Sequence, residues 1–282
     1  MKTALVLEGG AKRGIYTAGV LDVMLEHNLL VDGVFGVSAG AIHGCSYASK
    51  QIGRSIRYNI KYGNDYRFMS FKSLFLTGNM VETDFCYHEL PEKLDPYDNE
   101  TFMKSGIEFY AVCSNVETGK PEYIKCKDMF AEIDYIRASA SMPLVSQIVE
   151  VGGKKLLDGG ITDSIPLKAA EEHGFEKNIV VLTRPKGYRK KPASLKWLIA
   201  WVYRKYPKFV EAFAMRPDMY NAELDYIEKQ ENAGKALVIS PSRLVKIKKM
   251  EPNLDIVREM YELGRHDALK MLDKISKYIK SV

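Results

Sequence analysis

The sequence lacks the features that mark several large classes of protein. It contains no run of about 18 apolar residues, the length that a membrane-spanning helix needs. The apolar run near the N-terminus stops at Glu8, which is too short for the core of a secretory signal peptide and predicts a buried strand instead. We therefore expect a cytoplasmic protein without a membrane span.

Cysteine is also scarce, and its spacing excludes two kinds of stabilised fold. Cys45, Cys86, Cys113 and Cys126 form no CxxC pair and are too few for a disulfide framework. Reduced thiols are the simpler interpretation, with no zinc site. No motif implies another metal or an organic cofactor, and the chain has no internal repeat and no low-complexity tract.

What the sequence does contain is an ordinary globular composition with alternating strand and helix patterns. Of its 282 residues, 46% are hydrophobic and 27% charged. The patterns predict strands at 3–8, 34–37, 107–113, 146–151, 178–183 and 236–240, and helices at 15–25, 39–50, 129–140, 165–173, 216–232 and 253–279. Such alternation indicates an α/β layered fold with a mostly parallel sheet.

The first motif with chemical meaning is Gly36-Val37-Ser38-Ala39-Gly40, which matches G-x-S-x-G. In this pattern a serine occupies a sharp turn between a strand and a helix, where the glycines allow a crowded backbone. The helix that follows directs its positive dipole end towards the serine hydroxyl. Ser38 is therefore a candidate nucleophile, although a tight turn with an incidental serine is an equal alternative on this motif alone.

The first predicted strand ends in a glycine-rich turn, Glu8-Gly9-Gly10-Ala11-Lys12-Arg13-Gly14. Free backbone N–H groups in such a turn can hold a phosphate or an oxyanion. A dinucleotide-binding turn is the competing interpretation, with Asp32 near the position of a ribose-binding acid. Ala11 stands where that fingerprint needs its middle glycine, which disfavours this alternative, and Asp32 is better explained as a turn residue.

A third element, Leu157-Asp158-Gly159-Gly160, places an aspartate between an apolar strand end and two glycines. Taken alone, most such sites are plain turns.

Together these three elements resemble the patatin-like phospholipase family in order and spacing over about residues 1–185. The stretch Arg137-Ala138-Ser139-Ala140-Ser141-Met142-Pro143 also looks like the small-residue segment that precedes D-G-G in that family. The resemblance implies a three-layer α/β/α fold with a mostly parallel sheet. It divides the chain into a catalytic core at 1–185 and a mostly helical C-terminal extension at 186–282.

The resemblance also implies a Ser-Asp dyad that hydrolyses carboxylic esters. We expect these to be esters of phospholipids or other lipids. Carried over by position, Ser38 is the nucleophile and Asp158 the general base. The backbone N–H groups of Gly9, Gly10 and Ala11 would form the oxyanion hole. Gly36, Gly40, Gly159, Gly160 and Arg13 would support the site, Arg13 either by anchoring the loop or by meeting an anionic head group. The family usually has a third glycine at Ala11, where a positive φ would strain an alanine.

Two other functional hypotheses stay open. One is a Ser-His-Asp triad on an α/β-hydrolase fold, for which His173 or His266 would follow Asp158 in the required order. Neither these histidines nor His43 lies in a loop that marks it as catalytic. The other is a lipid-binding or regulatory protein with the patatin fold and little turnover, which the intact Ser38 and Asp158 disfavour.

Positive charge is concentrated in one part of the chain. Residues 184–216 contain ten Lys or Arg and one acid, Glu211, and therefore carry +9 in a chain whose net charge is +5. The segment 194–215 within it also holds both tryptophans, Trp197 and Trp201, beside an apolar helical stretch. This composition fits either a cap helix over the core or a peripheral membrane anchor. No nucleic-acid-binding module accompanies the charge.

Overall fold

One mixed sheet of eight strands lies at the centre of the computed structural model, which describes residues 1–192 and 195–281. The strand order is β5-β6-β3-β2-β1-β7-β8, and β4 pairs with β3 outside this path. The pairs within β3-β2-β1-β7-β8 are parallel, whereas β4, β5 and β6 are added in antiparallel fashion. The strands are β1 (Thr3–Leu7), β2 (Gly33–Val37), β3 (Glu108–Asn115), β4 (Lys120–Cys126), β5 (Val149–Val151), β6 (Lys154–Asp158), β7 (Lys177–Val181) and β8 (Ala236–Ile239).

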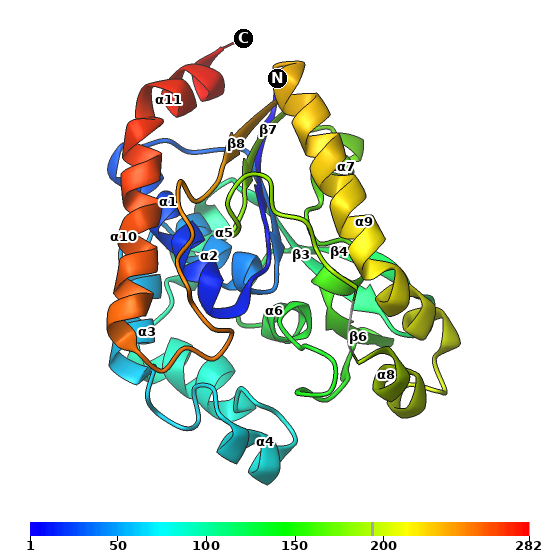
Figure 1. The fold of residues 1–282 in the computed structure, drawn as a ribbon. Coiled ribbons are helices and arrows are strands. Elements are labelled where there is room, and N and C mark those ends of the chain that lie inside the picture. Colours follow the sequence, from blue (N-terminus) through cyan, green and yellow to red (C-terminus); the bar gives the residue numbers. More distant parts are fainter. Residues whose placement is uncertain (193–194, 282) are drawn as a thin grey trace.

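Helices cover both faces of the sheet and make three layers (Figure 1). Successive side chains of β1 point to opposite faces, so Leu5 and Leu7 enter one core while Ala4 and Val6 enter the other. The first core is completed by α1 (Ile15–Glu26), α2 (Ala39–Ala48) and α10 (Leu254–Lys270). The second is completed by α7 (Leu167–Glu172) and α9 (Pro207–Asn232). The predicted three-layer α/β/α fold is confirmed.

The remaining helical elements are short. They are the 3-10 turns η1 (Ala11–Gly14) and η3 (Gly159–Ile161), the π-helical segment η2 (Phe85–Leu94), α3 (Arg54–Tyr62), α4 (Phe71–Thr77), α5 (Asn99–Lys104), α6 (Ile133–Ser139), α8 (Lys196–Val202) and α11 (Leu272–Lys280). Within residues 1–192 and 195–281, no helix combines the length and the apolar character needed to cross a membrane.

The part of the chain after residue 186 is built into the same layers. Strand β8 pairs in parallel with β7. Helix α10 packs backbone to backbone on α1, because a Cβ atom on Gly19 would lie 2.2 Å from the carbonyl oxygen of Tyr261. The helical C-terminal region is therefore present as expected, and it contributes one strand to the central sheet.

Several element boundaries differ from the sequence prediction. The helix predicted over 253–279 is two helices, because Met271 leaves helical geometry (φ −100°, ψ 3°) and separates α10 from α11. The helix predicted to start at 216 starts at Pro207, whose fixed φ suits the first turn of a helix. Only Val149–Val151 of the strand predicted at 146–151 is extended. Strand β4 lacks a strong apolar alternation and was not predicted, and of β6 only the apolar end before Asp158 was anticipated.

Candidate active site

Ser38 occupies the sharp turn between β2 and α2, as the motif predicts. Its backbone has φ 54° and ψ −121°, a combination that costs a non-glycine residue energy and is maintained by the surrounding structure. The backbone N–H of Ser38 donates to Oγ of Ser139 at 2.9 Å, and the Ser139 hydroxyl donates to the carbonyl oxygen of Val112 at 2.7 Å. Ser139 thus ties the serine turn to β3.

The glycines of the motif allow close packing at this turn. A Cβ atom on Gly40 would lie 2.4 Å from the carbonyl oxygen of Leu7, and one on Gly36 would lie 2.5 Å from Cα of Ala41. Real Cβ contacts are not that short, so any side chain here would push α2 away from the sheet. The start of α2, and with it Ser38, is fixed by these contacts.

Asp158 lies at the end of β6 and is almost completely buried. Strand register brings it towards Ser38, because Val37 pairs with Val112 on β3 and the next β3 residue, Cys113, pairs with Asp158. Oδ1 of Asp158 accepts the backbone N–H of Gly160 at 2.8 Å. Oδ2 has no hydrogen-bond partner among the described residues, which leaves it available to accept a proton.

Burial raises the pKa of the Asp158 carboxyl above its ordinary value. The positive charge of Arg216, the Ser38 hydroxyl and the Gly160 N–H group act in the opposite direction and lower that pKa. Because burial dominates, the carboxylate is a stronger base than a solvated aspartate.

The glycine-rich turn after β1 lies directly against Ser38. A Cβ atom on Gly9 would lie 3.0 Å from Cβ of Ser38. The N–H groups of Gly9, Gly10 and Ala11 donate to no other group among the described residues, and all three residues are half-buried. Ala11 has a φ of 49°, which is the left-handed conformation that disfavours alanine.

Asp32, the candidate ribose-binding acid, is a turn residue. Its Oδ2 accepts the backbone N–H of Thr3 at 2.7 Å, at the beginning of β1. It therefore lies at the opposite end of the strands from Gly9 and Gly10, and the geometry does not fit dinucleotide binding.

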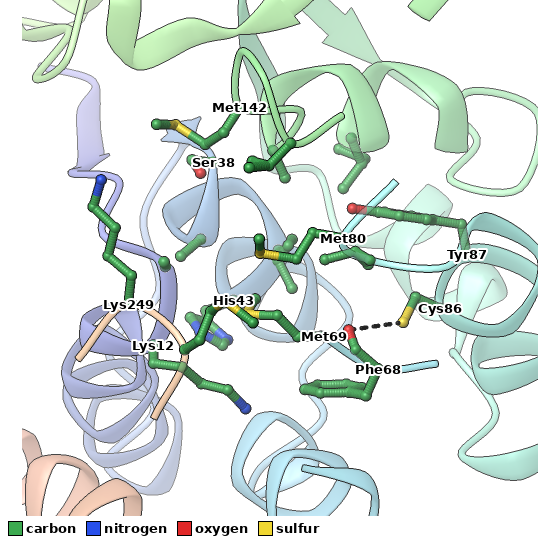
Figure 2. A pocket seen from close by; sticks show the side chains of 18 of the residues that line it. Lys12, Ser38, His43, Phe68, Met69, Met80, Cys86, Tyr87, Met142 and Lys249 are labelled. Carbon is green, nitrogen blue, oxygen red and sulfur yellow. Dashed lines mark hydrogen bonds between the residues drawn. The ribbon is translucent and has the colours of Figure 1, made fainter. Parts of the chain in front are cut away.

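A large cavity of about 610 Å³ opens beside Ser38. Most of its walls are apolar, and they include Ile42, Phe68, Met69, Met80, Tyr87 and Met142. Figure 2 shows Ser38 and Met142 at one end and Lys12 and Phe68 at the other. A cavity of this size and lining suits an apolar ligand such as an acyl chain.

A second, much smaller pocket of about 90 Å³ adjoins the first. The residues that line both are Ala11, Ser38, Met142, Lys190, Arg216 and Lys249. Its lining is more polar than that of the large cavity and includes the glycine turn, Asp158, Arg13 and Arg216. Nε of Arg13 is buried there without a partner among the described residues. Ser38 therefore stands where an apolar cavity and a polar pocket join.

The three histidines that the sequence left open are engaged elsewhere. His43 is buried inside α2, where Nδ1 lies 3.1 Å from Oγ of Ser55, and burial lowers its pKa to about 3. Nδ1 of His173 lies 2.7 Å from the carbonyl oxygen of Ala169. His266 is on α10, beside Asp267. Of the three, only His43 is among the residues that line the two cavities, and no hydrogen bond joins it to Ser38.

The basic aromatic segment forms α8 and the start of α9, with residue 194 outside the described residues. Ile199 is buried and lines the large cavity. Trp197 and Trp201 are 70% and 65% exposed. The segment thus covers the cavity with one face and presents its tryptophans to solvent with the other.

Three residues beside the site were not predicted individually. Ser139 belongs to the small-residue stretch, but no sequence rule assigns it to the Ser38 turn. Arg216 and Lys249 reach the polar pocket from α9 and from the loop before α10, far along the chain. The only sequence signal for Arg216 is the positive charge of its segment.

Comparison with known proteins agrees with this geometry. A family model described as patatin-like phospholipase matches residues 5–171, and a domain of unknown function, DUF6363, matches residues 206–280. The chain is 28% identical to the uncharacterized protein YjjU of Escherichia coli, over 94% of this chain and 75% of that one. It is also 28% identical to lysophospholipase nte1 of Aspergillus terreus, over 57% of this chain and 10% of the fungal protein.

The chain therefore spans about a tenth of the length of that fungal lysophospholipase. Among solved structures, VipD from Legionella pneumophila is similar with a TM-score of 0.48 and 12% identity, over 97% of this chain and 67% of that one.

The fold and the family match define a lipid acyl hydrolase. More particularly, the chain belongs to the patatin-like phospholipase family, whose model covers more than half of its length.

Proposed function

We propose that the protein hydrolyses carboxylic esters of lipids through an acyl-enzyme on Ser38, with Asp158 as the general base. The observation that carries this proposal is the position of Ser38. It is held with a positive φ in a strained turn, at the junction of a large apolar cavity and a smaller, more polar pocket that contains the buried Asp158 carboxylate of raised pKa. A strained residue at such a junction is typical of a reaction centre.

In the first half of the reaction, Oγ of Ser38 attacks the ester carbonyl while Oδ2 of Asp158 takes the hydroxyl proton. The C–O bond to the alcohol then breaks, and the alcohol leaves with the proton that Asp158 returns. In the second half, the same carboxylate takes a proton from water, the hydroxide attacks the acyl-enzyme, and Ser38 leaves as the hydroxyl. Protons balance over the cycle, and no histidine is needed.

The negative charge that develops on the carbonyl oxygen needs donors that are already in place. The N–H groups of Gly9, Gly10 and Ala11 donate to none of the residues that the structure describes, and they lie on a turn packed against Ser38. The start of α2 adds its positive dipole end from the other side of Ser38. We assign the oxyanion hole to this turn, because N–H groups that are fixed before the reaction stabilise the transition state without reorganisation.

The large cavity is assigned to the acyl chain. Burial of the chain there would contribute a favourable binding free energy of about 25 cal/mol per Å² of apolar surface removed from water. Lysophospholipase relatives in fungi support a single-chain lipid ester as the substrate class.

The test is hydrolysis of a long-chain p-nitrophenyl ester and of a lysophospholipid by the wild type and by Ser38→Ala and Asp158→Asn. We expect Ser38→Ala to fall to the assay background. Asp158→Asn should lose about 10²–10⁴-fold, which is the usual contribution of a general base. Ser242→Ala and Asp218→Asn, both exposed, are the matched controls and should keep wild-type rates.

Turnover that persists in Ser38→Ala would contradict the nucleophile assignment. Lipid binding without turnover in the wild type would favour the lipid-binding alternative instead.

We further propose that the protein contacts an anionic lipid surface at the mouth of the large cavity. Two short helices with exposed apolar side chains, α4 and α8, flank the loop at 142–147. On the α4 side, the N–H of Met80 donates to the carbonyl oxygen of Val145. On the α8 side, the hydroxyl of Tyr203 accepts the N–H of Leu144. Figure 1 shows both helices at the end of the molecule opposite the two chain termini.

The chemistry of these helices supports this contact. Phe75 on α4 is 88% exposed, and Trp197 and Trp201 on α8 remain mostly in solvent. Exposed basic side chains accompany them, including Lys72, Lys196, Arg204, Lys205 and Lys208. Aromatic side chains beside Lys and Arg fit the boundary between lipid chains and anionic head groups.

Vesicle flotation tests this contact with phosphatidylglycerol-containing and purely zwitterionic vesicles. Trp197→Ala and Phe75→Ala should each weaken binding by about 10- to 150-fold, since burying one such side chain contributes about 1.5–3 kcal/mol. The control is Leu269→Ala, which replaces an exposed apolar residue near the C-terminal end of α10, and this variant should bind normally. Binding that ignores both variants, or no binding to either vesicle, defeats the proposal.

A further inference from the structure

The small pocket beside Ser38 is lined by five cationic side chains from four separate parts of the chain. They come from η1, from the segment after β7, from α9 and from the loop before α10, and they are Arg13, Arg184, Lys190, Arg216 and Lys249. Of the residues that the structure describes, two acids line the same pocket, Glu8 and Asp158. Positive charge is therefore in excess at the place where the alcohol side of an ester would lie.

Neither acid neutralises this charge through an ion pair. Among the described residues, none of the five cations lies within 4.0 Å of a carboxylate oxygen in a salt bridge. The oxygens of Glu8 are occupied by neutral donors, since Oε1 accepts the hydroxyl of Tyr220 at 2.7 Å and Oε2 accepts the N–H of Thr183 at 2.6 Å. Asp158 is the proposed base.

The cations are held in place by neutral contacts instead. Nζ of Lys190 lies 3.9 Å from the centre of the Tyr220 ring, and the guanidinium of Arg184 lies 4.7 Å from that of Tyr188. Nε of Arg216 donates to the carbonyl oxygen of Gly160. Such contacts fix the side chains and leave their charges free to act on a ligand.

Gathering these charges is unfavourable for the empty protein. Burial, and then the charge of Arg216, lowers the pKa of Lys190 to about 7. Burial followed by Arg216 and Arg13 also lowers the pKa of Lys249. Nε of Arg13 is buried without a partner among the described residues. Uncompensated cations of this kind cluster at functional sites, where an anionic ligand supplies the missing partner.

We propose that this basic pocket binds the phosphate of a substrate whose head group is net negative, and so selects acyl esters of anionic phosphates over zwitterionic ones. The inference rests on the proposed function, because it takes Ser38 as the point where the ester is cleaved. Ser38 lines both cavities, so an ester bound there extends its acyl chain into the large one and its phosphate into the small one.

The two volumes agree with this division of the substrate. The basic pocket, at about 90 Å³, has room for a phosphate group but not for a second acyl chain. A quaternary ammonium group would meet an excess of like charge in this pocket, five cations against two acids, which disfavours a phosphocholine head group. The preferred class is therefore a monoacyl ester of glycerol phosphate or a similar small phosphate.

The first arm of the test measures binding without turnover. Calorimetry on Ser38→Ala protein compares inorganic phosphate, glycerol 3-phosphate, 1-acylglycerol 3-phosphate and uncharged 1-acylglycerol. We expect both phosphates to bind, and the acylated phosphate to bind more tightly than either glycerol phosphate or the uncharged acylglycerol. Arg184→Gln and Lys249→Gln should each weaken phosphate binding about tenfold, and Lys168→Gln, an exposed lysine on α7, should not weaken it.

The second arm measures selectivity as the ratio of kcat/KM for 1-acylglycerol 3-phosphate to that for 1-acylglycerophosphocholine. This ratio should exceed about ten in the wild type and fall towards one in Arg184→Gln and Lys249→Gln. Arg184→Lys, which keeps the charge, should restore most of it, and melting curves confirm that each variant is folded.

The outcomes separate this inference from the proposed function. If the wild type hydrolyses no ester but binds phosphate in a way that depends on Arg184 and Lys249, the phosphate-binding pocket is supported and the Ser38–Asp158 dyad is refuted. If the wild type hydrolyses both substrates with a kcat/KM ratio near one, and the ratio is unchanged in both variants, the proposed selectivity of the pocket is refuted. Free phosphate that binds while the acylated phosphate binds no better than the uncharged acylglycerol also overturns it, because the site would then serve a free anion.

Discussion

Replacing Ala11 by glycine tests whether the candidate oxyanion turn stores strain. Ala11 has φ 49°, a conformation that costs an L-residue about 1–2 kcal/mol and costs glycine almost nothing. Glycine loses about 0.4–1 kcal/mol through the greater freedom of the unfolded chain. Ala11 lines the large cavity and is only half-buried, so removal of its methyl group should sacrifice little packing. The net expectation is stabilisation by about 0.5–1 kcal/mol.

Thermal unfolding followed by circular dichroism measures this effect. At about 2–4 °C per kcal/mol for a chain of this size, Ala11→Gly should raise Tm by about 1–4 °C. The matched control is Ala222→Gly, an exposed position inside α9, which should lower Tm by a similar amount because glycine destabilises a helix. If Ala11→Gly lowers Tm as much as the control does, the turn is not strained and our description of it is wrong.

Three further predictions address the electrostatics and packing of the site. Arg216→Gln should move the acid limb of the pH profile of kcat/KM to higher pH, because it removes the positive charge that most lowers the pKa of Asp158. An acid limb that stays at the same pH or moves to lower pH would contradict this prediction. Sulfate binding to Ser38→Ala protein should weaken as pH rises from about 7 upward, because Lys190 loses its proton in that range. The charged groups that act on Lys190 are Arg13, Arg216, Glu8 and Glu223. Equal sulfate affinity at pH 6 and pH 9, measured by calorimetry, would contradict this prediction. Gly40→Ala should destabilise the protein by about 1–3 kcal/mol, since its methyl would lie 2.4 Å from the Leu7 carbonyl oxygen, and an unchanged Tm would refute that packing.

The sequence was most informative where one short segment determines local geometry. The G-x-S-x-G motif predicts the turn at Ser38 because only a tight strand-to-helix connection needs glycine at both flanking positions. The turn at Gly9 to Ala11 follows in the same way from glycines after a buried strand. Even the positive φ of Ala11 was anticipated as a cost, because the family places glycine there.

What could not be predicted depends on contacts between distant segments. Arg216 and Lys249 lie more than 170 residues after Ser38, and no spacing rule places them in the pocket that Ser38 lines. The break between α10 and α11 at Met271 carries no glycine or proline that would signal it in the sequence. Helix α4 has seven residues, too few for an amphipathic period to stand out, so its exposed aromatic side chains had no signal.

The measurement that tests the central claim most directly is covalent labelling with a fluorophosphonate, followed by mass-spectrometric mapping of the modified peptide. Such a probe phosphonylates an activated serine, and we expect a single label on Ser38 in the wild type. We expect no label in Ser38→Ala and slow labelling in Asp158→Asn, because the hydroxyl then lacks its base. Labelling that survives in Ser38→Ala, or that maps to another residue in the wild type, would contradict the account.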